Sequence, residues 1–145
     1  MSKLTDTKRA YERVRDLLEQ QLLTRRSDAQ EVRDALAAVE VAFYLLGWSQ
    51  FEFLARKEAE QRIKGYAASK TADGIAWRYV NDNIKAFSLR RKLDVIFSAN
   101  QTTLGALNKD YDLRNEAAHN YQKLPSEARD VAAWLEHLED LVSRF

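Results

Sequence analysis

The chain has 145 residues, 46% of them hydrophobic and including three Trp, six Tyr and six Phe, which suits one domain with a real core and excludes a disordered chain. It has no Cys, which excludes disulfide bonds, zinc sites with thiolate ligands and cysteine nucleophiles. With 23 basic and 22 acidic residues its formal charge is +1, so the chain as a whole has no field that draws it onto nucleic acid.

Only four Gly and one Pro interrupt the chain, and this scarcity of helix breakers predicts helix throughout. The most apolar run, residues 39–48, is too short to cross a bilayer, and the polar N-terminus lacks the apolar stretch of a signal peptide. We therefore expect a cytoplasmic protein without a membrane segment. We also expect residues 1–145 to form a single domain.

Two amphipathic helices are predicted in the first part of the chain. Apolar residues at three- and four-residue steps predict the first helix over about residues 6–26. Ser27 and Asp28 then offer an N-cap for a second helix that continues to about residue 62. Gly47 interrupts the apolar spacing of this second helix, which is either one long helix or two helices joined near that glycine.

The middle of the chain is less regular. Residues 65–74 have no hydrophobic periodicity and predict a loop, followed by a short packed segment over residues 75–80. Asn81 or Asp82 can cap the next helix, and residues 98–103 supply another break.

Two further helices complete the prediction. The first contains Leu107 and continues until Pro125 ends it, and Ser126 can cap the last helix. That last helix carries the clearest apolar stripe of the chain, from Val131 to Phe145. Short connections between helices favour antiparallel neighbours. The sequence therefore predicts an all-α fold, an up-and-down antiparallel bundle of four to five helices.

The residues best suited to chemistry lie in the fourth of these helical segments, as Arg114, Asn115, His119 and Tyr121. At about 100° per residue, Asn115 and His119 share one helix face, while Arg114 lies roughly 140° from His119 and nearly in line with Tyr121. Arg114 must then approach the histidine from the flank, or the helix must begin at Arg114. A second possibility is that two copies of the helix face each other across a two-fold axis and build one cleft from paired motifs.

This Arg-x4-His-x-Tyr pattern resembles the signature of the HEPN superfamily. The aromatic segment from Phe43 to Phe53, which contains Glu52, is similar to the second helix of HEPN ribonucleases of the RiboL-PSP and RNase LS groups. The resemblance implies a helical bundle, a homodimer and a role in a prokaryotic defence or toxin–antitoxin system. It also implies a cognate antitoxin such as a minimal nucleotidyltransferase, which can inactivate such proteins by adenylylating the tyrosine at the position of Tyr121.

These residue types suit cleavage of RNA by its own 2′-hydroxyl, which requires proton transfer and charge stabilisation but no metal or other cofactor. His119 can exchange protons near neutral pH and act as general base or acid. Arg114 can bind the scissile phosphate through its bidentate fork, and Asn115 can orient the imidazole or a phosphate oxygen. The resemblance implies the same division of roles and products that end in a 2′,3′-cyclic phosphate.

Several alternatives remain open at the level of sequence. The domain could be a non-catalytic HEPN module that binds nucleotides or a nucleotidyltransferase. Glu52 could be a buried carboxylate turned toward the motif or an ordinary exposed residue. Tyr121 could be a core anchor or a contact to RNA. His137 is expected to pack in the last helix, and Trp77 is the one tryptophan near a loop, where it could stack on a base.

The tightest basic run consists of Arg90, Arg91 and Lys92. These side chains could hold the phosphates that flank a cleaved bond, or they could form an ordinary solvated helix face. The sequence favours the solvated face.

Overall fold

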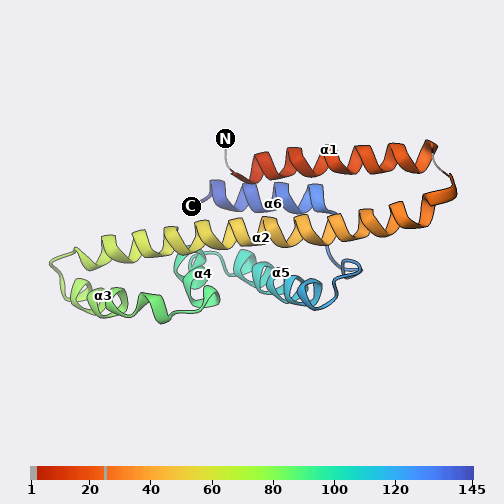
Figure 1. The fold of residues 1–145 in the computed structure, drawn as a ribbon. Helices are drawn as coiled ribbons and strands as arrows, with labels where there is room; N and C mark the ends of the chain where they lie inside the picture. Colours follow the sequence, from red (N-terminus) through yellow and green to blue (C-terminus); the bar gives the residue numbers. More distant parts are fainter. Residues whose placement is uncertain (1–2, 25) are drawn as a thin grey trace. The chain divides into compact units, whose positions relative to one another are not determined.

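The computed structural model describes residues 3–24 and 26–145, and within these residues the chain is all-α, without strands (Figure 1). The α-helices are α1 (Lys3–Thr24), α2 (Ala29–Ala67), α3 (Ala72–Asp82), α4 (Leu89–Phe97), α5 (Gln101–His119) and α6 (Val131–Ser143). Short 3-10 turns occupy Arg26–Asp28 and Ile84–Ala86. The predicted all-helical class is confirmed, whereas the described residues form six α-helices instead of four to five.

The extra helix comes from the region predicted as a loop and a short packed segment. Helix α3 starts at Ala72, and Asn81 and Asp82 are its last residues instead of the cap of the next helix. The cap of α4 is Ser88, whose hydroxyl accepts a hydrogen bond from the Arg91 amide at 3.4 Å.

Gly74, predicted to lie in a loop, is buried in the first turn of α3. A Cβ atom there would collide with the Ser69 carbonyl, so glycine serves close packing at this position.

Helix α2 is continuous through Gly47. A Cβ atom at this glycine would collide with the Leu135 side chain, so its role is a close approach between α2 and α6 instead of a helix break. The last connection also differs from the prediction. Helix α5 ends at His119, well before Pro125, and the cap of α6 is Asp130 instead of Ser126. The Asp130 carboxylate accepts a hydrogen bond from the Ala133 amide at 3.0 Å.

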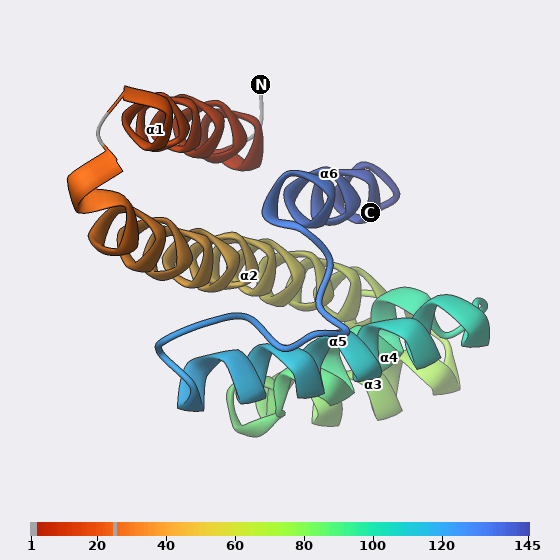
Figure 2. The ribbon, with the colours of Figure 1, turned by 90° about the vertical axis from the view of Figure 1, so that its right-hand side faces the viewer.

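The helices divide into two compact units, each described by itself. The first unit contains α1, α2 up to Phe51, α5 from Asp110 onward, and α6. Helices α1 and α6 lie side by side against the first part of α2 (Figures 1 and 2). The core of this unit consists of fully buried aromatic and aliphatic side chains, chiefly Leu4, Tyr44, Trp48, Phe51, Trp134, Leu135, Leu138 and Leu141.

Three aromatic rings dominate this core. The Trp134 ring stacks on Tyr44 with 4.5 Å between centroids and on Trp48 with 5.8 Å. Its Nε1–H donates to the Tyr44 carbonyl at 3.1 Å. The stack therefore joins α6 to α2 through both apolar contact and a hydrogen bond.

The second unit contains α2 from Glu52 onward, α3, α4, and α5 up to Lys109. Its core is made mainly of small and aliphatic side chains together with one aromatic ring, chiefly Ala55, Ala59, Ile63, Leu89, Leu93, Leu107 and Phe97. Two polar contacts fix α4 against α2. Lys92, only 2% exposed, pairs with Glu60 at 3.1 Å, and Arg62 Nη1 donates to the Ile96 carbonyl at 3.1 Å. None of the helices in the described residues is long and apolar enough to cross a membrane.

The charged carboxylate of Glu40, in the first unit, destabilises the folded protein. Glu40 on α2 is half-buried, and burial raises its pKa, as do the carboxylates of Asp130 and Glu19, while Arg15 lowers it. The folded protein therefore holds more protons than the unfolded chain between the ordinary and the raised pKa, and stability falls as pH rises through that window.

We expect Glu40→Gln to raise the melting temperature at about pH 7, because the amide removes a poorly solvated charge. The gain should shrink near the ordinary glutamate pKa, at about pH 4. Thermal unfolding followed by circular dichroism at both pH values measures this, with the exposed Glu31→Gln as control. An equal shift at both pH values would contradict the electrostatic cause.

Candidate active site

Three of the four motif residues lie in the last two turns of α5. Asp110 and Ala117 mark the buried side of this helix, while His119 lies on the exposed side as its last residue. Arg114 is half-buried, one turn from Asp110. The structure therefore places Arg114 and His119 on different sides of α5, as the helical spacing predicts.

Arg114 and Asn115 contact each other directly. Arg114 Nη1 donates a hydrogen bond to Asn115 Oδ1 at 3.0 Å. Arg114 Nε is buried and has no hydrogen-bond partner among the described residues. Asn115 thus orients the guanidinium in this structure, and the His119 imidazole is left exposed to solvent. The arrangement holds an arginine fork in place and keeps a proton-transferring group accessible one turn away.

Tyr121 does not lie on the helix, so its predicted alignment with Arg114 is wrong. The chain leaves the helix after His119 because Asn120 begins a turn: its Oδ1 accepts from the Gln122 amide at 3.3 Å. Asparagine favours such local turns over a continuing helix. Tyr121 is 74% exposed and is therefore not a core anchor.

The Tyr121 side chain lines a surface hollow of about 470 Å³. The other residues at this hollow are Asp34 and Ala38 of α2 and Gln122. Because Tyr121 is largely exposed beside this hollow, its side chain is accessible to an approaching molecule.

Glu52 has a partner on its own helix. Its carboxylate accepts hydrogen bonds from Arg56 Nη2 at 2.7 Å and Arg56 Nε at 3.0 Å, one turn along α2. The residue is half-buried and belongs to the second unit. Its charge is therefore balanced locally, as in an ordinary helical ion pair.

A hydrogen-bonding contact between α6 and α5, one turn from the motif, was not predicted from the sequence: its His137 side is half-buried and its Asp110 side is buried. His137 Nε2 lies 3.2 Å from Asp110 Oδ2, which joins α6 to α5 one turn before Arg114. Burial raises the pKa of the nearby Tyr44 hydroxyl, and the Asp110 carboxylate raises it further. The spacing of charges along one helix could not reveal this pair, because its members come from different helices.

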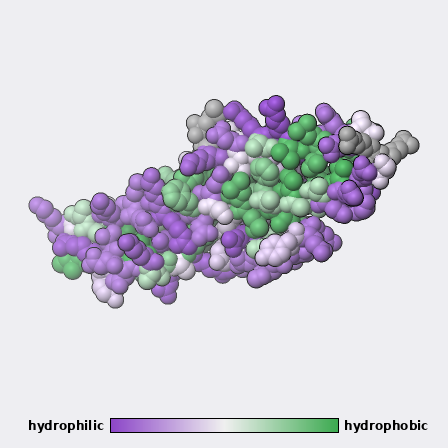
Figure 3. All heavy atoms as spheres, viewed as in Figure 1, coloured by the Kyte–Doolittle hydropathy of each residue, from purple (hydrophilic) through white to green (hydrophobic). Residues whose placement is uncertain are grey.

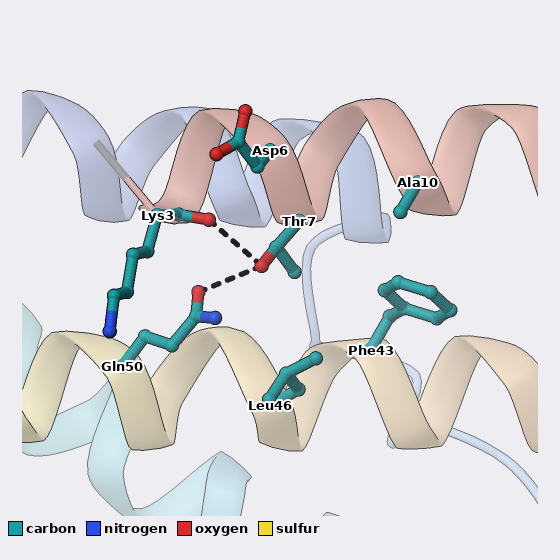
Figure 4. Close-up of a pocket in the computed structure, with 7 residues that line it drawn as sticks. All are labelled: Lys3, Asp6, Thr7, Ala10, Phe43, Leu46 and Gln50. Carbon is teal, nitrogen blue, oxygen red and sulfur yellow. Dashed lines mark hydrogen bonds between the residues drawn. The ribbon is translucent and has the colours of Figure 1, made fainter. Parts of the chain in front are cut away.

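A second hollow, of about 410 Å³, lies between α1 and α2 (Figure 4). Its walls include Phe43 and Leu46, and its central polar groups bond to each other. Thr7 Oγ1 lies 2.9 Å from both Gln50 Oε1 and the Lys3 carbonyl oxygen, and its single proton is shared between these two acceptors. Because these groups are already satisfied, the hollow suits helix packing better than catalysis.

Among the described residues, no three His, Asp or Glu side chains gather in a way that could hold a metal ion. Comparison of the chain with protein families, curated proteins and solved structures gives no match.

Proposed function

We propose that this protein is a metal-independent endoribonuclease of HEPN type that works as a homodimer in the cytoplasm. The observation that carries the proposal is the end of α5, where an exposed His119 follows a hydrogen-bonded Arg114–Asn115 pair by one turn. The Arg-x4-His spacing of the HEPN signature supports it, as does the all-helical fold. The finer arrangement, a HEPN-like antiparallel bundle forming one domain, is part of the same proposal.

In the proposed reaction, the 2′-oxygen of the RNA attacks the adjacent phosphorus, and His119 takes the 2′-hydroxyl proton. Arg114 offsets the charge that develops on the phosphate oxygens, with Asn115 holding its guanidinium in position. The bond from phosphorus to the 5′-oxygen breaks, and the leaving oxygen takes up the proton that His119 accepted. The products are a 2′,3′-cyclic phosphate and a 5′-hydroxyl.

We assign the protein a role as toxin or effector in a prokaryotic defence or toxin–antitoxin system. Its partner would then be an antitoxin such as a minimal nucleotidyltransferase, which adenylylates Tyr121. The 74% exposure of Tyr121 supports this role, because a modifying enzyme must reach the hydroxyl. The nearby hollow offers space for the nucleotide.

The proposal is tested by incubating the purified protein with total RNA in excess EDTA. We expect internal cleavage to continue without free metal and the fragments to end in 2′,3′-cyclic phosphate and 5′-hydroxyl groups. If the RNA stays intact at high protein concentration and the protein binds a nucleotidyltransferase tightly, the ribonuclease hypothesis fails and a non-catalytic HEPN module is the better explanation. Cleavage that stops on EDTA addition would contradict the metal-independent mechanism.

A further inference from the structure

The near-neutral charge of the chain conceals a strong asymmetry between its two units. Residues 52–109 carry eleven Lys or Arg against six Asp or Glu, a formal charge of +5. The rest of the chain carries twelve against sixteen, a formal charge of −4. The second unit therefore has the electrostatic character of a nucleic-acid-binding surface, which the whole-chain charge hides.

Ion pairs balance the charges in one part of the second unit, so its excess positive charge lies in another part. Three acidic residues of α2 are already paired: Glu52 with Arg56 at 2.7 Å, Glu58 with Arg62 at 2.6 Å, and Glu60 with Lys92 at 3.1 Å. These pairs balance the first part of the unit. Lys92 is buried and paired with Glu60, so it cannot bind phosphate together with Arg90 and Arg91.

Most of the excess positive charge of this unit lies between Lys64 and Arg91. Residues 64–91 contain six basic residues and two acidic ones, Asp73 and Asp82. All eight are exposed, the basic ones being Lys64, Lys70, Arg78, Lys85, Arg90 and Arg91. In the part of the chain that the structure describes, Lys64, Lys70 and Lys85 form no ion pair. Their charge is therefore available to a ligand.

Exposed aromatic and apolar side chains occur in the same segment. Tyr79 is 74% exposed and Ile75 is 65% exposed, one turn apart on the same face of α3. Tyr66, 46% exposed, packs against Trp77 with 4.9 Å between ring centroids. Figure 3 shows mainly hydrophilic residues over α3 and the end of α2, with only scattered apolar ones among them. Packing in a hydrophobic core does not explain Tyr79 and Tyr66, because both side chains are exposed to solvent.

We propose that the exposed side chains of residues 64–91, which we call the α3 surface, bind single-stranded RNA. Lysine and arginine contact the phosphates, while Tyr79 and Tyr66 stack on unpaired bases. A duplex hides its base faces, and an acidic protein would not need exposed rings, so the combination favours a single strand. The binding needs no His119 and thus goes beyond the proposed cleavage.

The aromatic contribution is tested by fluorescence anisotropy with a labelled single-stranded RNA of about twelve nucleotides, within the usual site size. The full-length His119→Ala protein in EDTA serves as the background, so that binding is measured without cleavage. We expect Tyr79→Ala to weaken binding at least about fivefold, since one stacked base contributes this much or more. Phe53→Ala, an exposed ring of α2 outside the surface, should leave binding unchanged.

The ionic contribution is tested by the salt dependence of the same binding. Replacing Lys70 and Lys85 together by Gln should reduce the slope of log K against log salt by about 1.4, or about 0.7 for each lost phosphate contact. The matched control replaces the exposed Arg9 and Arg13 of α1, which should leave the slope unchanged. Equal slopes in both double variants would overturn the assignment of this surface.

Two competitors decide what the surface recognises. If duplex RNA binds as tightly as the single strand, stacking on unpaired bases is contradicted. If poly-glutamate competes as well as RNA does, the ligand of this surface is an acidic protein instead of RNA. Because binding and cleavage are measured separately, the two proposals can fail separately. If the protein binds RNA through Tyr79 but never cleaves it, the proposed RNA-binding surface stands and the proposed ribonuclease activity is contradicted.

Discussion

Replacing Trp134 by alanine should lower the free energy of unfolding by about 3–5 kcal/mol, the usual loss when a fully buried aromatic side chain is truncated. The ring is 0% exposed and lies between the rings of Tyr44 and Trp48. Alanine would leave a cavity between two helices and remove the hydrogen bond to the Tyr44 carbonyl. Urea unfolding followed by circular dichroism measures the change in stability.

Trp134→Phe is the matched control. It keeps a stacking ring but removes the Nε1–H donor, so its loss should be close to that of one hydrogen bond, about 1 kcal/mol, plus the smaller ring area. If the alanine and phenylalanine variants unfold at the same urea concentration, the stack contributes little. The core of the first unit must then be held together elsewhere.

The long helices could be predicted from the sequence because their apolar faces are read from local spacing. Helix α6 shows a clear apolar stripe, and Trp134, Leu135, Leu138 and Leu141 in it are all buried. The short helices could not be predicted as well. Gly74 favours a loop in the sequence. In the structure, a glycine is needed there because a Cβ atom would collide with the Ser69 carbonyl, and this contact exists only in the folded chain.

The candidate site was predictable only where one helix contains it. The relation of Arg114 to His119 followed from helical geometry, whereas the contact of Asp110 with His137 joins two helices far apart in sequence. Tyr121 was misplaced because the turn at Asn120 ends α5 before proline does. The charge asymmetry was missed for a similar reason: it becomes visible only when the boundary of the second unit is known.

Replacing His119 by glutamine should reduce the rate of RNA cleavage by about 10²–10⁴-fold, the usual contribution of a general acid or base. The melting temperature should not change, because the side chain is exposed at the helix end. His137→Gln is the matched control, since it alters the other histidine of the chain. We expect it to lower stability through loss of the pair with Asp110 and to keep cleavage in the folded protein. The opposite pattern would move the chemistry to His137.

Mixing two inactive variants tests whether the site is shared between chains. Arg114 is half-buried and His119 exposed on another side of α5, so one copy does not direct both side chains to the same point. Two copies meeting at this helix could supply the arginine from one chain and the histidine from the other. A mixture of Arg114→Ala and His119→Ala proteins, exchanged into mixed dimers, should therefore cleave RNA faster than either variant alone. If mixed dimers form but remain inactive, the two groups must act within one chain, and α5 must rearrange on binding RNA to bring them together.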